Sequence, residues 1–193
     1  LSSCITIGLV ATGLMGYSNS IARDRDKGVF QRLRVAPMPS WCIMASRLIV
    51  QLLMITLLTV IVFIAGNNID HITLSPTGYA ITFFTAIIGG AVYLGLGQVV
   101  VGLIQNPETV NSTVRLIYFV FIIVGMFGEF GILGEQVKEM VKWSPYGTVK
   151  AVIAAGMLPE TWNGDTTTSL FVTIGYAVLF SVIGIRKFKW NNK

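Results

Sequence analysis

The sequence predicts an all-α protein, a polytopic membrane bundle of five spanning helices. Hydrophobic residues make up 53% of the chain and charged residues only 12%, about half the share that soluble domains carry. Five apolar stretches are each long enough to cross a bilayer as a helix, which takes about 20 residues. Their apolar runs are continuous, whereas the strands of a membrane barrel would alternate over about ten residues. We expect one transmembrane domain over residues 1–193, with spans at about 1–21, 41–66, 77–104, 110–133 and 167–185.

The first stretch, residues 1–21, begins at Leu1 and contains no charged residue. It is long enough to span the membrane, and no small-residue cleavage pattern of a signal peptide follows it. Together with the odd number of spans, this start predicts that the chain is part of a longer protein with a further N-terminal span. Small residues at helical spacing, which let helices approach closely in lipid, are Gly8, Gly13 and Gly16.

Residues 23–34 form the only densely charged stretch and must leave the membrane between the first two spans. We expect a short amphipathic helix over about 23–36, because Pro37 cannot continue a helix and Ser40 is a good cap for the next one. A simpler alternative is that these charges only set the topology. The apolar residues that share one face of this helix at helical spacing are Val29, Phe30 and Leu33.

Positive charges predict the orientation, because lysines and arginines collect on the cytoplasmic side of a membrane protein. With residues 23–34 inside, eleven Lys and Arg lie on the inner side and three on the outer side. We therefore expect a multi-pass protein of the cell membrane whose charged bend and C-terminus are cytoplasmic. The three outer cations are Lys138, Lys142 and Lys150.

The region before the last span is less apolar and is not a simple loop. Ser144 and Pro145 have the pattern of an N-cap followed by proline at the first helical position. Upstream, Val137, Met140 and Val141 form an apolar stripe opposite charged residues. We expect two short extracellular helices over about 135–158, a hairpin that either dips into the outer leaflet or lies on it.

Several chemistries are absent from the sequence. It contains no phosphate-binding G-x-x-x-x-G-K-[ST] motif, no metal-ligand cluster, and a single histidine, His71. We therefore expect no enzyme activity and no cofactor in this chain. Carboxylates are missing from the middle of every span, and Glu129 toward the outer end of the fourth is the nearest exception. Glu129 either lines an exit route or locks the outer helices, or it only reaches the membrane interface, and the driving energy must come from a partner.

The charged bend resembles the coupling signature of type-2 ABC exporter permeases, in which an acidic–basic–acidic triplet, a glycine, and a basic–leucine pair before proline form a coupling helix. Ser144-Pro145 is similar to the Ser-Pro element after the fifth of that family's six spans. The family often has glutamate where Asp24 and Asp26 stand. The coupling residues that the resemblance implies are Asp24, Arg25, Asp26, Gly28, Phe30, Arg32, Leu33 and Pro37.

The resemblance implies that the chain holds the last five spans of a six-span permease. Two permease copies or homologues would pair in membrane lipid, and separate ABC ATPase subunits would bind the ATP. The implied function is export of an amphipathic or lipophilic drug, antibiotic or lipid across the cytoplasmic membrane, without nucleic acid as a partner. The alternatives are a membrane scaffold or assembly subunit without transport, and a permease for polysaccharide or lipid. The residues implied at an exit or gate are Glu129, Ser144 and Pro145.

Overall fold

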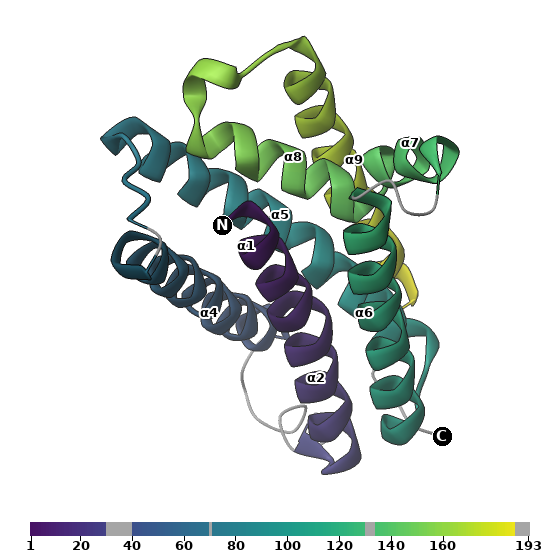
Figure 1. Cartoon of the computed structure of the whole chain (residues 1–193). Coiled ribbons are helices and arrows are strands. Elements are labelled where there is room, and N and C mark those ends of the chain that lie inside the picture. Colours follow the sequence, from purple (N-terminus) through teal and green to yellow (C-terminus); the bar gives the residue numbers. More distant parts are fainter. Residues whose placement is uncertain (30–39, 70, 130–133, 188–193) are drawn as a thin grey trace.

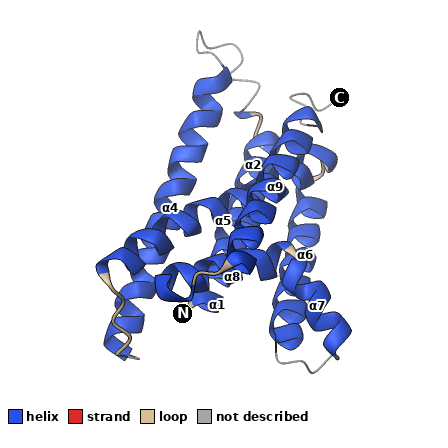
Figure 2. Ribbon diagram, turned by 90° about the horizontal axis from the view of Figure 1, so that it is seen from above, coloured by secondary structure: helices blue, strands red, loops and turns tan. Residues whose placement is uncertain are grey.

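The computed structural model describes residues 1–29, 40–69, 71–129 and 134–187, and the regular secondary structure of these residues is entirely helical. Figure 2 shows long helices joined by short connections, without a strand among the described residues. Five of the helices in this part of the chain are long and apolar enough to cross a membrane. The predicted all-α membrane fold with five candidate spans is therefore confirmed.

The first candidate span is continuous from Ser2 to Asp26 and has three parts. These are α1 (Ser2–Leu9), a π-helical stretch η1 (Val10–Gly16) and α2 (Tyr17–Asp26). Figure 1 shows them as one rod that ends at the bottom of the view. The span is thus longer than the predicted range 1–21.

The helix stops because the chain turns at Gly28. Gly28 has a φ of 65°, a left-handed conformation that glycine adopts without steric cost. Its amide donates to the carbonyl of Arg25 at 3.1 Å. The first four residues of the predicted coupling helix, 23–26, therefore continue the first span, and Gly28 interrupts a single helix over 23–36. Residues 30–39 lie outside the described part of the chain.

The other four spans lie close to their predicted positions. They are α4 (Ser40–Ile69), α5 (Pro76–Leu103), α6 (Pro107–Glu129) and α9 (Gly164–Lys187). Ser75 caps α5, because its Oγ accepts a hydrogen bond from the Gly78 amide at 3.1 Å. The outer end predicted for the fourth span, residues 130–133, lies outside the described residues.

Helix α5 is the centre of the bundle and contacts the first helix, α4, α6, α8 and α9. Glycines permit this close packing: a Cβ added at Gly13 would lie 2.8 Å from the Cβ of Tyr93. On another face, a Cβ at Gly95 would lie 3.0 Å from the Cβ of Phe180 in α9. Close backbone approach through small residues is how helices pack where lipid leaves little hydrophobic driving force.

Two short helices precede the last span: α7 (Glu135–Trp143) and α8 (Pro145–Met157), followed by the 3₁₀ turn η2 (Pro159–Thr161). Helix α8 packs against α1, α5 and α9 and buries Tyr146, Val149 and Ile153. It therefore enters the bundle instead of lying on its surface, whereas α7 is largely exposed.

The outer surface of the bundle is strongly apolar. Figure 1 shows α4 and α6 on either side of the first helix, and both expose large side chains, for example Leu53 at 63% and Leu116 at 65%. Phe171 of α9 is 69% exposed. Such surface is costly in water and stable in lipid.

Candidate functional site

Arg25 in the last turn of α2 binds the end of another span. Only 8% of it is exposed, and its guanidinium donates to the carbonyls of Val101 at 2.8 Å and Ile104 at 3.0 Å. These carbonyls belong to the C-terminal turn of α5, where a helix leaves its last carbonyls without internal donors. A cation is also favoured at the negative end of the helix dipole. Arg25 therefore fastens the end of the first helix to the end of α5.

Asp24 binds a third span. Its carboxylate forms an ion pair with the guanidinium of Arg47 near the start of α4. Both side chains are partly buried, with 28% of Asp24 and 19% of Arg47 exposed. Neighbouring residues of the acidic–basic–acidic triplet thus connect the first helix to α4 and to α5.

Of the other predicted coupling residues, two lie in the described part of the chain and four lie outside it. Asp26 is exposed at the last position of α2, and Gly28 forms the turn that follows. Asp24, Arg25, Asp26 and Gly28 thus lie near one another in sequence at the end of the first helix, where Asp24 and Arg25 contact other helices. The other four predicted positions, which lie outside the described residues, are Phe30, Arg32, Leu33 and Pro37.

Sequence reasoning missed the polar contacts inside the bundle. The Gln51 side-chain amide of α4 donates to the Thr12 carbonyl within η1, and the Ser18 hydroxyl donates to the Gly97 carbonyl of α5 at 3.2 Å. A π-helical stretch displaces carbonyls from regular α geometry, and such stretches are frequent at functional sites. The signal for Gln51 was its place in an otherwise apolar span, where a polar side chain needs a partner.

Two cavities lie beside these contacts, one along the first helix and one between the first helix and α4. The larger has a volume of about 600 Å³ and reaches from Met15 past Asn19 to Lys27. The smaller, of about 200 Å³, has Tyr17, Arg47 and Gln51 in its wall. Ser20 lines both, so a partly polar path leads from the charged end of α2 toward the π-helical stretch.

At the other end of the bundle, Ser144 and Pro145 connect α7 and α8. The Ser144 Oγ accepts from the Gly147 amide at 3.1 Å and donates to the Val141 carbonyl at 2.7 Å. This confirms the predicted N-cap with proline at the first helical position. Glu129 is the last residue of α6, and the structure describes its backbone only.

A third cavity of about 520 Å³ lies beside these residues. Two glycines of α6 and three lysines of α7 and α8 line this cavity. No group of three His, Cys, Asp or Glu that could hold a metal ion occurs among the residues that were placed. The cavity is lined by Gly125, Gly128, Gln136, Lys138, Glu139, Val141, Lys142, Tyr146, Gly147 and Lys150.

Comparison with known proteins gives consistent findings. The family described as ABC-2 type transporter matches residues 3–148, which include the triplet and the Ser-Pro element. Among curated proteins, the "Putative transport permease YvfS" of Bacillus subtilis (strain 168) is 22% identical over 187 residues, covering 95% of this chain and 74% of that protein. No solved structure matches the chain.

Proposed function

The chain belongs to the ABC-2 type transporter family, and from this premise we propose that it is the transmembrane subunit of an ATP-driven exporter. Membership makes it a multi-pass membrane permease and a transport subunit. The proposal adds the energy source and the direction. A separate ABC ATPase subunit binds and hydrolyses ATP and docks on the bend after Asp26, and the permease moves an amphipathic or lipophilic compound outward.

The observation that carries the coupling role is the junction of three helices at residues 24 and 25. Arg25 binds the C-terminal carbonyls of α5, and Asp24 binds Arg47 of α4. Both residues directly precede the exposed Asp26 and the turn at Gly28. A partner that pushes on this turn displaces the ends of the first helix, α4 and α5 together, because polar contacts connect them.

The distribution of charge supports the orientation of this junction. Three exposed cations lie near the junction: Arg23 on α2, Lys27 in the turn that follows α2, and Arg115 on α6. The C-terminal end of α9 adds Arg186 and Lys187 to the same predicted side. Placing this end in the cytosol makes the turn accessible to an ATPase.

The path formed by the two cavities beside the first helix supports an amphipathic substrate. Its walls combine apolar side chains such as Met15 with the polar groups of Asn19, Ser20 and Gln51. The mixture suits a compound with one polar and one apolar end, since pockets bind mainly through apolar surface with a few placed polar groups. The pairing of two permease copies belongs to the same proposal.

Co-purification of the ATPase tests the proposal. Gly28→Pro forces φ to about −65°, opposite in sign to the observed 65°, and removes the amide that closes the helix. We expect this variant to insert into the membrane and to lose its ATPase. Gly134→Ala is the matched control, because Gly134 also has a positive φ of 92° but precedes α7 at the other end of the molecule.

Normal recovery of the ATPase with Gly28→Pro would rule out coupling at this turn. Absence of any ATPase from the unaltered protein would favour the scaffold alternative. With the complex in hand, the compounds that stimulate ATP hydrolysis then identify the substrate class and separate drug or lipid export from polysaccharide export.

A further inference from the structure

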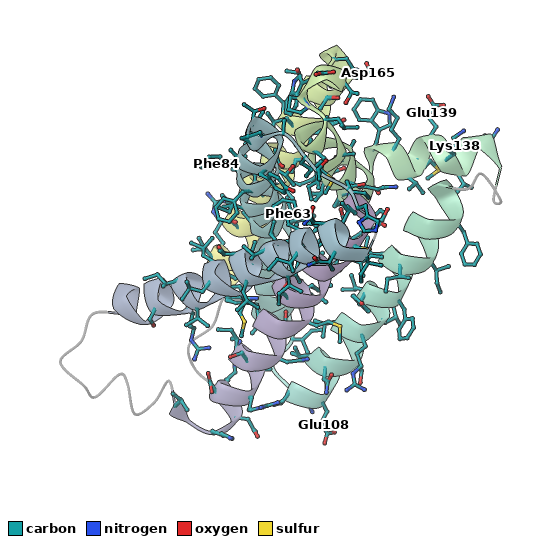
Figure 3. All side chains as sticks on the ribbon, turned by 60° about the vertical axis from the view of Figure 1, so that its left-hand side comes forward. Phe63, Phe84, Glu108, Lys138, Glu139 and Asp165 are labelled. Atoms are coloured by element: carbon teal, nitrogen blue, oxygen red, sulfur yellow. The ribbon has the colours of Figure 1, made fainter. Side chains whose placement is uncertain are left out.

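The end of the molecule opposite the Arg25 junction contains a pocket with an unusual lining. Figure 3 shows Lys138, Glu139 and Asp165 at the end away from Glu108, which lies in the first turn of α6 beside the junction. The pocket of about 520 Å³ lies between the end of α6 and the two short helices. This volume is within the range of pockets that hold drug-sized molecules.

The floor of this pocket is apolar and tightly packed. A Cβ added at Gly128 would lie 2.6 Å from a methyl group of Val141, and a Cβ at Gly125 would meet the ring of Tyr146. Because both glycines of α6 lack a side chain, Val141 and Tyr146 pack directly against that helix and form the apolar wall of the pocket. Such a surface binds a hydrocarbon or aromatic group, and excludes water from it.

The three lysines assigned to the outer side by the sequence all line this one pocket. Lys138 and Lys142 are four residues apart on α7 and so share a face of that helix. Lys150 reaches the pocket from α8, where the neighbouring Val149 and Val152 are each 1% exposed. An ionisable side chain inside a membrane protein is costly, usually faces the bundle interior or a water-filled cavity, and marks a candidate functional site.

Two acidic side chains are described beside these lysines, Glu139 and Asp165. Glu139 is the carboxylate in the described lining, and Lys142 also pairs with Asp165 at 3.6 Å. Both partners of that pair are well exposed, with 53% of Lys142 and 80% of Asp165 accessible. Exposed pairs are weak, so an incoming anion can take the place of Asp165. Lys138 and Lys150 also interact within the protein.

We propose that this lysine pocket binds an anionic amphiphile. Its phosphate or carboxylate lies among Lys138, Lys142 and Lys150, and its apolar part lies against Val141 and Tyr146. This inference rests on the proposed function, because it assigns an acidic headgroup to the exported compound and places its binding at the outer end of the permease. Binding itself requires no ATPase.

Equilibrium binding of dodecyl phosphate to the full chain in phosphatidylcholine nanodiscs tests the pocket. In the triple variant Lys138→Gln, Lys142→Gln, Lys150→Gln the Kd should rise at least tenfold. The matched control Arg115→Gln, Arg186→Gln, Lys187→Gln removes three exposed cations from the other end of the molecule, and its Kd should stay within twofold of that of the unaltered protein. Dodecyltrimethylammonium should not compete.

Equal binding by both triple variants, or equal competition by the ammonium compound, would overturn the proposal, because either result means apolar partition without charge recognition. The double variant Lys138→Gln, Lys142→Gln changes exposed side chains only and covers the case in which the triple variant does not fold. In this double variant the Kd should rise severalfold, and an unchanged Kd would contradict binding at this pocket.

A last arm identifies the source of the amphiphile. If phosphatidylglycerol in the nanodisc displaces dodecyl phosphate, the pocket takes a lipid of the bilayer, and if it does not, the pocket takes a diffusible anionic cargo. Because these measurements omit the ATPase, loss of lysine dependence leaves the exporter proposal intact. Conversely, failure to recover an ATPase would leave lysine-dependent binding unaffected.

Discussion

The guanidinium of Arg25 donates to the carbonyl oxygen of Val101 at 2.8 Å across 76 positions of sequence. A second nitrogen of the same group reaches the carbonyl of Ile104 at 3.0 Å. One side chain thereby satisfies two carbonyls at the end of the central helix α5. The bend that a cytosolic partner would contact is therefore joined to the core of the bundle by a short, directed connection.

Removing this connection should destabilise the protein. For Arg25→Ala we expect a loss of about 2 kcal/mol, because hydrogen bonds from a charged donor contribute about 1.5–3 kcal/mol and buried carbonyls lose their donor. Arg25→Lys should recover only part of it, since an ammonium cannot reproduce the fork of the guanidinium. Thermal unfolding in detergent measures both. Arg23→Ala, an exposed neighbour, is the control, and equal melting of the two alanine variants would contradict the assignment.

The ion pair of Asp24 and Arg47 should show a measurable coupling energy. We expect about 1 kcal/mol in a double-mutant cycle of Asp24→Asn and Arg47→Gln, the upper end for partly exposed pairs. The exchange of both charges, Asp24→Arg with Arg47→Asp, should restore part of the stability lost in each single variant. Strictly additive effects in the cycle would show that the contact contributes nothing.

Close packing of the first helix on α5 depends on Gly13. In Gly13→Ala the new methyl would lie 2.8 Å from the Cβ of Tyr93 and 3.2 Å from the backbone nitrogen of Leu94, so the helices must separate. We expect a loss of about 1–3 kcal/mol from this overpacking. Gly175→Ala in α9 has nothing within 4 Å of the added methyl and should be neutral or slightly stabilising. Thermal unfolding of the two variants compares them, and equal stability would be evidence against the contact.

Substitutions of Ser144 distinguish a structural role of this residue from a role in gating. Ser144→Ala should cost about 1 kcal/mol through loss of the N-cap of α8. Ser144→Asp should be more stable than Ser144→Ala, because a carboxylate also accepts from the Gly147 amide, although it cannot donate to the Val141 carbonyl as the hydroxyl does. If transport follows stability in both variants, the residue is structural. A loss of transport in Ser144→Asp that exceeds the loss in Ser144→Ala would assign the residue to the exit route.

Glu129 is tested by a change that keeps its size. If its carboxylate lines the exit route, Glu129→Gln should slow transport in a reconstituted system several-fold while ATP hydrolysis persists. Unchanged transport would remove Glu129 from the site and leave it as a residue of the membrane interface.

The helical fold could be predicted because bilayer thickness sets the length of each apolar run, and the cap at Ser144 because it depends on neighbouring residues. The burial of α8 could not be predicted from its pattern, since a helix that is apolar on most faces fits a bundle or a lipid surface equally well. Likewise, the charges of residues 24–26 do not show whether each faces a partner chain or another helix. For Arg25 and Asp24 the described partners lie within the chain.

The π-helical stretch η1 also determines which way the charged triplet faces. A π turn accommodates one residue more than an α turn, and one residue corresponds to about 100° of rotation around a helix. If the stretch between Val10 and Gly16 took regular α geometry with all its residues retained, the whole lower half of the rod would turn by about this angle. Arg25 would then rotate away from α5, and one of its acidic neighbours would confront the negative pole of that helix.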